Sequence, residues 1–235
     1  MVQGQTETVN GTAATLRFRL RKTGMLRFIS HLDFLRTMEH AVVRAGLPVR
    51  YSEGFNPHVK LSFGMPLSVG SESVAEYMDV QLLRPMDTAQ AMACMNAQLP
   101  DGLQILAAAP PVHRFSEISC AEYLLRLSYP GANAADAARI QTLWSGPLTV
   151  LKRTKKGEMQ VDISPLIRKV HLVARQEALE ATVLLSAASD SYLNPEYLLR
   201  AATQALSIPM EDPTQTDIYV LRRAVFLADG VTPFS

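Results

Sequence analysis

The chain has 235 residues, enough for one large domain or two small ones with a buried core. Apolar residues make up 48% and charged residues 19%, with a formal net charge of +1, as in globular proteins. No apolar run reaches the roughly 18–20 residues of a membrane-spanning helix, and the two cysteines, Cys94 and Cys120, are far apart. These features exclude a membrane protein and a disulfide scaffold, and they predict a cytoplasmic protein with reduced thiols.

The N-terminal segment divides into a tail and a strand. Residues 1–14 are polar and lack the basic start and apolar stretch of a signal peptide, so we expect a disordered tail. The following TLRFRLRK alternates strictly between apolar and basic residues, as in a half-buried strand. The apolar set is Leu16, Phe18 and Leu20, and the basic set is Arg17, Arg19 and Arg21.

A helix is predicted after this strand. Ser30 is a good N-cap, Asp33 occupies the third position of a capping box, and Gly46 is suited to end the helix. The segments that follow complete a β-α-β-β-α-β order: strands over 47–52 and 74–82, a helix from 85 to about 97, and a strand over 102–109. Residues 60–64 are also compatible with a short strand.

The second half shows the same order. Its expected elements are a strand at 120–129, a helix at 133–145, a hairpin at 147–162, a strand at 178–187, a helix at 195–206 and a strand at 217–227. We therefore predict an α+β protein made of tandem ferredoxin-like units with antiparallel sheets, over 15–111 and 117–228. PPVHRFS, residues 110–116, is the expected linker.

One sheet face of each such unit is left free by the helices. The basic set of the first strand would line that face in the first unit. Tyr77 and Asp79 alternate in the same way, so they could instead lie opposite the arginines as cross-strand pairs. Both interpretations remain open, because a partly neutralised basic face can still bind phosphate.

Motifs for common chemistries are absent from the sequence. It has no Gly-rich phosphate loop, G-x-S-x-G or H-E-x-x-H. Two cysteines cannot form a C-x₃-C-x₂-C run, so the chain cannot hold an iron–sulfur cluster by its own thiolates. We expect neither a metal nor a cofactor bound by this chain.

Charge is uneven along the chain. Residues 1–64 hold nine Lys/Arg against four Asp/Glu, and a second basic cluster lies at 152–175. Within the first cluster, YSEGFNPHVKLSFG places Phe55 among cationic side chains on a Gly-Asn-Pro turn. Basic groups interleaved with an aromatic ring suit single-stranded nucleic acid, although a simple turn with Phe55 buried would also fit.

Two further segments are candidates for the same role. His31 begins the predicted helix in FISHLD, where it could be a hydrogen-bond partner, a general base or a packing residue. RTKKG forms a Lys-rich hairpin tip that could contact a nucleic-acid backbone or simply be solvated. The candidate residues for nucleic-acid or anion binding are Arg17, Arg19, Arg21, His31, Arg36, Arg50, Tyr51, Phe55, Asn56, His58, Lys60, Arg153, Lys155 and Lys156.

From FISHLD through VRYSEGFNPH-x-KLSFG the chain resembles the bacterial radical-SAM-linked domain of unknown function. That domain occurs alone or fused to the C-terminal end of B12-binding radical SAM proteins. The resemblance covers about residues 15–225, with KRTKKGEMQVDI as a weaker match, and this chain has Val59 where the family usually has proline. It implies a stand-alone form, associated with RNA or the translation apparatus and with a partner that uses S-adenosylmethionine, an iron–sulfur cluster and cobalamin.

Three functions are compatible with these observations. The first is a non-catalytic module that binds RNA or another phosphate-bearing ligand and presents it to a radical SAM partner. The second is a metal-independent ribonuclease or RNA-modifying enzyme with His31 or His58 as general base and Lys60 stabilising the transition state. The third is a protein-interaction module whose open sheet face covers a radical SAM partner.

Overall fold

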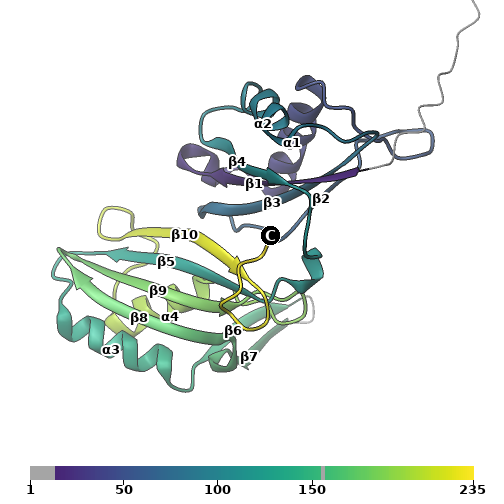
Figure 1. Ribbon diagram of the computed structural model, residues 1–235. Coiled ribbons are helices and arrows are strands. Elements are labelled where there is room, and N and C mark those ends of the chain that lie inside the picture. The colour runs from purple at the N-terminus through teal and green to yellow at the C-terminus, as the bar shows by residue number, and fades with distance from the viewer. Residues whose placement is uncertain (1–13, 155–156) are drawn as a thin grey trace, which may run out of the picture.

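The computed structural model describes residues 14–154 and 157–235, apart from the side chains of residues 153 and 154. Its main feature is one eight-stranded sheet in the order β4-β1-β3-β10-β5-β9-β8, with β2 also paired to β3 (Figure 1). The fold class is confirmed as α+β with mostly antiparallel strand pairs.

The first half follows the expected β-α-β-β-α-β order. Its capping signals were predicted correctly: the Ser30 side chain accepts a hydrogen bond from the Asp33 amide, and Gly46 has a φ of +66° just after the helix. The segment 47–52 forms only isolated bridges in place of the predicted strand. The elements are β1 (Ala14–Lys22), α1 (His31–Arg44), β2 (Leu61–Phe63), β3 (Glu72–Leu82), α2 (Thr88–Asn96) and β4 (Leu103–Ala109), with a 3-10 turn η1 (Gly24–Phe28).

The second half repeats this order with an insertion. The predicted hairpin exists, but it forms a separate two-stranded sheet, and the strand beside β9 is one that the sequence analysis missed. This strand, β8, carries buried Leu172, whereas the described β7 side chains are largely exposed, so only β8 can close the core. The elements are β5 (Cys120–Ser128), α3 (Ala134–Ser145), β6 (Thr149–Thr154), β7 (Gly157–Asp162), β8 (Ile167–Arg175), β9 (Ala178–Ser186), α4 (Glu196–Leu206) and β10 (Asp217–Phe226), with 3-10 turns η2 (Phe115–Glu117) and η3 (Ser164–Leu166).

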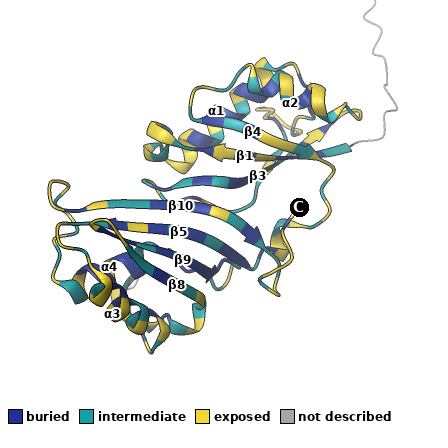
Figure 2. Cartoon of the chain, turned by 60° about the vertical axis from the view of Figure 1, so that its left-hand side comes forward, coloured by how far each residue is buried: buried dark blue, intermediate teal, exposed yellow. Residues whose placement is uncertain are grey.

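Two hydrophobic cores lie on opposite faces of β3. Met78 and Val80 belong to the core under α1 and α2, while Ala75 belongs to the core that α3 and α4 cover. Because successive strand residues point to opposite faces, the two helix pairs flank the sheet from opposite sides. Figures 1 and 2 show the two helix pairs at opposite ends of the molecule with the strands between them.

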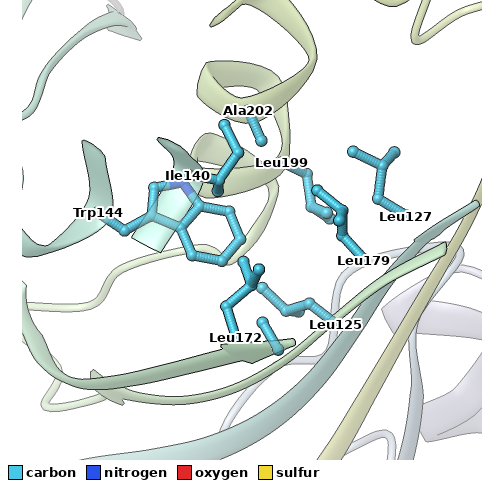
Figure 3. A pocket seen from close by; sticks show the side chains of 9 residues that line it. Leu125, Leu127, Ile140, Trp144, Leu172, Leu179, Leu199 and Ala202 are labelled. Carbon is cyan, nitrogen blue, oxygen red and sulfur yellow. The ribbon is translucent and has the colours of Figure 1, made fainter. Parts of the chain in front are cut away.

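The second core is centred on the chain's single tryptophan. Trp144 on α3 lies beside Leu199 and Ala202 of α4, above Leu125 and Leu172 of the sheet (Figure 3). Its indole N–H donates to the main-chain oxygen of Leu198 at 3.2 Å, so the buried polar atom is satisfied.

The halves join between β3 and β10. These strands pair in parallel over two residue pairs only, Leu221 with Glu72 and Arg222 with Ser73, and β2 takes the same edge of β3 farther along. Beyond these two residue pairs β3 and β10 diverge, and the space between the diverging strands is here called the fork.

Candidate nucleic-acid interface

The segment from residue 49 to residue 61 folds into a projecting hairpin, here called the GFNPH hairpin. Tyr51 and Val59 form a bridge, and the Ser52 amide donates to the His58 main-chain oxygen at 2.8 Å. The Ser52 hydroxyl oxygen accepts from the His58 amide at 3.1 Å. Gly54, with a φ of +123°, supplies a conformation that side chains disfavour. The hairpin is thus closed by its own hydrogen bonds.

Phe55 lies at the tip of this hairpin, wholly exposed at 108% of its reference surface. The alternative interpretation, a simple turn with Phe55 buried, is therefore wrong. Asn56 and His58 are exposed beside it. His58 Nδ1 lies 3.2 Å from the Asn56 main-chain oxygen, and because that oxygen only accepts, the contact favours a proton on Nδ1. Nε2 then remains to contact a ligand.

Two cations lie at the base of the hairpin. The Lys60 amide donates to the Arg50 main-chain oxygen at 2.8 Å, which sets these residues side by side. Both side chains are half-buried, and Tyr51 next to them is exposed. The structure therefore brings together six of the predicted residues: Arg50, Tyr51, Phe55, Asn56, His58 and Lys60.

Arg17 does not line an open face, contrary to the prediction. It is 5% exposed and forms two hydrogen bonds to the Asp79 carboxylate, at 2.7 and 2.8 Å. Its Nη1 donates to the main-chain oxygens of His113 and Ser235, and its guanidinium lies over the rings of Phe115 and Phe234. Arg17 therefore joins distant segments of the chain, and its charge is already paired with that of Asp79.

The other arginines of β1 remain exposed. Arg19 is paired in register with Tyr77, as Arg17 is with Asp79, so the cross-strand interpretation is confirmed. Arg19 Nε donates to the Val74 main-chain oxygen at 3.1 Å. Arg19 and Arg21 lie on the far side of the buried Arg17 from Lys60, so the residues predicted on one face form two separate surfaces.

The FISHLD segment does not join the hairpin, so these two candidate segments do not form one site. His31 begins α1 and is exposed, whereas the hairpin follows the other end of this 14-residue helix. At 1.5 Å per residue the helix is about 21 Å long. Arg36 is also exposed, with its Nη1 3.7 Å from Asp33. The N-terminus of α1 therefore cannot donate to an anion on the hairpin.

The tip of the second hairpin lies outside the described residues. Lys155 and Lys156 belong to it, and the Arg153 side chain is likewise not described. Their predicted role stays a prediction.

The second half also has an open sheet face, and its residues were not among the candidates from the sequence. Leu125 faces α3 and α4, so its neighbours Leu124 and Arg126 point to the other side. There the Arg126 guanidinium lies 5.3 Å from the centre of the Tyr219 ring, whose hydroxyl donates to Glu72 at 3.0 Å. The alternation in CAEYLLRLSY was the available signal.

Metal ligands and membrane-spanning helices were considered among the described residues only. No group of three or more His, Cys, Asp or Glu is placed to hold a metal in that part of the chain. None of the described helices is long and apolar enough to cross a membrane.

These features define an α+β protein with a forked sheet and an exposed basic-aromatic hairpin. Residues 15–195 match the model of a family described as "Uncharacterized protein conserved in bacteria (DUF2344)". The chain belongs to this family. Among curated proteins no sequence matches it.

Solved structures share the fold at low identity. A chain in the crystal structure of a Cbf5-Nop10-Gar1 complex aligns with a TM-score of 0.51 and 10% identity, over 89% of this chain and 48% of that one. A chain in the archaeal box H/ACA sRNP Nop10-Cbf5 complex gives a TM-score of 0.46 and 10% identity, over 88% and 46%. This chain therefore spans about half the length of the structures it matches.

Proposed function

We propose that this protein is a non-catalytic RNA-binding module whose GFNPH hairpin binds single-stranded RNA. The observation that carries the proposal is the wholly exposed Phe55 on a hairpin closed by its own hydrogen bonds. Exposure of an aromatic ring to water is unfavourable. An unpaired base can stack on such a ring and remove its apolar surface from water. A pre-shaped hairpin also loses little conformational freedom on binding.

The cations of the hairpin supply contacts to the RNA backbone. Lys60 and Arg50 lie side by side at its base, and His58 presents Nε2 nearby. Charge-assisted contacts to phosphate position a strand without reading its sequence.

Geometry disfavours the alternative ribonuclease. A metal-independent cleavage needs a base and an acid or cation at one phosphate. His31 and His58 lie at opposite ends of α1, so they cannot act on the same phosphate. His58 and Lys60 alone remain, and the His58 Nδ1 contacts are with Ser52 and Asn56, not with a carboxylate.

The protein partner is part of the same proposal. A radical SAM protein, carrying S-adenosylmethionine, an iron–sulfur cluster and cobalamin, would act on the RNA that this module holds. This assignment rests on the sequence resemblance alone. Purification of the native protein with crosslinked partners, followed by mass spectrometry, tests it, and repeated recovery of no radical SAM protein would contradict it.

The RNA-binding proposal is tested by fluorescence anisotropy with a labelled single-stranded RNA at several salt concentrations. Phe55→Ala should weaken binding by about 1–3 kcal/mol, because one stacked base is lost, with little change in salt dependence. Lys60→Ala should instead make the plot of log binding constant against log salt concentration less steep. The slope should decrease in magnitude by about 0.7–1, because one phosphate contact is lost.

Matched controls come from exposed residues elsewhere. Val43→Ala removes an exposed apolar side chain from α1, and Arg139→Ala removes an exposed cation from α3. Both should bind RNA like the parent protein. If Phe55→Ala and Lys60→Ala fold normally and also bind like the parent, the hairpin is not the RNA site.

A further inference from the structure

A hollow of about 320 Å³ lies on the first-half sheet, on the face away from α1 and α2. Its floor comes from one row across three strands, in which Ala107 of β4 pairs with Arg19 of β1, and Arg19 pairs with Tyr77 of β3. Ala109 and the Phe234 ring also line it. Two alanine methyl groups make a flat, shallow floor, and this volume is within the range of small-molecule sites.

Arg19 is the available charge in this hollow. Its Nε donates to the Val74 main-chain oxygen, which anchors the side chain and leaves the terminal nitrogens to act as donors. In the described part of the chain no carboxylate forms an ion pair with Arg19. Arg17 also borders the hollow, but Asp79 balances its charge. A ligand would therefore meet the Arg19 guanidinium without an Asp or Glu side chain paired to it.

Tyr77 adds an acceptor beside that cation. Its hydroxyl donates to the Phe234 main-chain oxygen at 3.0 Å, so the single O–H is used and the oxygen lone pairs remain. Burial raises the pKa of the Tyr77 hydroxyl, and the positive charge of Arg19 opposes this effect only in part. The phenol therefore stays neutral. The hollow thus combines a flat apolar floor, one acceptor and one cation.

We propose that this hollow binds a nucleoside monophosphate unit. The flat base lies over Ala107 and Ala109 with an N–H group donating to the Tyr77 oxygen, and the phosphate meets the terminal nitrogens of Arg19. Arginine forms paired hydrogen bonds with phosphate oxygens, which fixes the orientation of the ligand. Both a free nucleotide and the terminal nucleotide of an RNA carry this unit. The site is separate from the GFNPH hairpin and does not depend on it.

The test is calorimetric titration with AMP and with adenosine. Arg19→Gln should weaken AMP binding about tenfold or more, the loss of one charge-assisted contact, and leave adenosine binding unchanged. Ala109→Leu should abolish binding of both ligands, because the added side chain fills the floor. Ala109 is exposed, so the larger residue does not disturb the core. The matched controls are Ala89→Leu and Arg139→Gln, both at exposed helix positions, and they should bind AMP normally.

Three results would overturn the proposal: no AMP binding at millimolar concentrations, normal AMP binding by Ala109→Leu, or binding of benzoate as tight as that of AMP. A short RNA with and without a 5′-phosphate separates the two sources. In the Phe55→Ala/Lys60→Ala variant, where the hairpin does not contribute, tighter binding of the phosphorylated RNA than of both AMP and the unphosphorylated RNA identifies the RNA terminus. Binding of the phosphorylated RNA no tighter than that of AMP identifies the free nucleotide. Phe55→Ala should bind AMP like the parent, so this site and the hairpin can fail independently.

Discussion

Arg17 shows how one buried charge can organise distant segments. Four of its hydrogen bonds reach Asp79, His113 and Ser235, so it joins β3, the linker after β4 and the C-terminal residues. Phe115 and Phe234 cover its guanidinium, with its central carbon 4.5 and 4.6 Å from their ring centres. The low-dielectric surroundings make these contacts strong, and they make a missing partner costly.

We predict that Asp79→Ala lowers the free energy of unfolding by about 3–5 kcal/mol, because it leaves Arg17 buried without its counter-charge. The double variant Arg17→Met/Asp79→Leu should recover much of that loss. Urea denaturation of the three proteins measures both effects. Arg36→Ala is the control, since its pair with Asp33 is exposed and worth about 1 kcal/mol or less. If Asp79→Ala lowers the free energy of unfolding by less than Arg36→Ala does, the structural role of Arg17 is contradicted.

At the scale of elements, a short turn holds the C-terminal segment in place. Asp229 accepts hydrogen bonds from the amides of Val231 and Thr232, at 3.0 and 2.9 Å, and from the Thr232 hydroxyl. The turn returns the chain so that the Phe234 amide donates to the Val225 main-chain oxygen at 2.9 Å. The position of Phe234 over Arg17 therefore follows from this turn.

The turn should open in acid. The hydrogen bond from the Thr232 side chain, followed by the two amides, lowers the pKa of Asp229 to about 2. Because the folded pKa is below the ordinary value of about 3.9, the stabilisation is complete above about pH 4 and is lost as pH falls through about 2. The protection factors of the Val231 and Thr232 amides against hydrogen exchange should fall over that range. Asp229→Asn should show no such acid step, and an identical step in that variant would contradict the assignment.

At the scale of the whole molecule, the joint between the halves depends on a second buried ion pair. Arg222 of β10, 1% exposed, donates from Nη1 to Glu76 of β3 at 2.9 Å and from Nη2 to the Pro66 main-chain oxygen at 2.7 Å. Its Nε donates to the Tyr123 hydroxyl at 3.3 Å. These contacts fill the fork where β3 and β10 separate, and they compensate for a strand pairing of only two residue pairs.

Removal of Glu76 should therefore destabilise both halves together. We predict that Glu76→Leu lowers the free energy of unfolding by about 3–5 kcal/mol, and that Arg222→Met/Glu76→Leu recovers part of it. Trp144 fluorescence reports on the second half, and amide exchange in α1 reports on the first. If the variant destabilises one half and leaves the stability of the other half unchanged, the Arg222–Glu76 ion pair does not couple the two halves.

The sequence by itself determined the local structure of this protein. Alternation in TLRFRLRK placed Leu16, Phe18 and Leu20 in the core, and the Ser30 and Gly46 signals bounded α1. Such signals act over one strand or one helical turn, so they can be read without knowing the fold. The same holds for the hairpin residues from Arg50 to Lys60, which are neighbours in both the sequence and the structure.

Only the tertiary structure decided which surfaces stay open. The path of residues 113–118 and 227–235 covers Arg17, and this path depends on long-range contacts that carry no local pattern. The same is true of the separation between FISHLD and the hairpin, which the length and direction of α1 impose. Burial of a charge depends on partners far along the chain, 62 residues away for Arg17 and 146 for Arg222, so alternation alone cannot distinguish a binding arginine from a structural one.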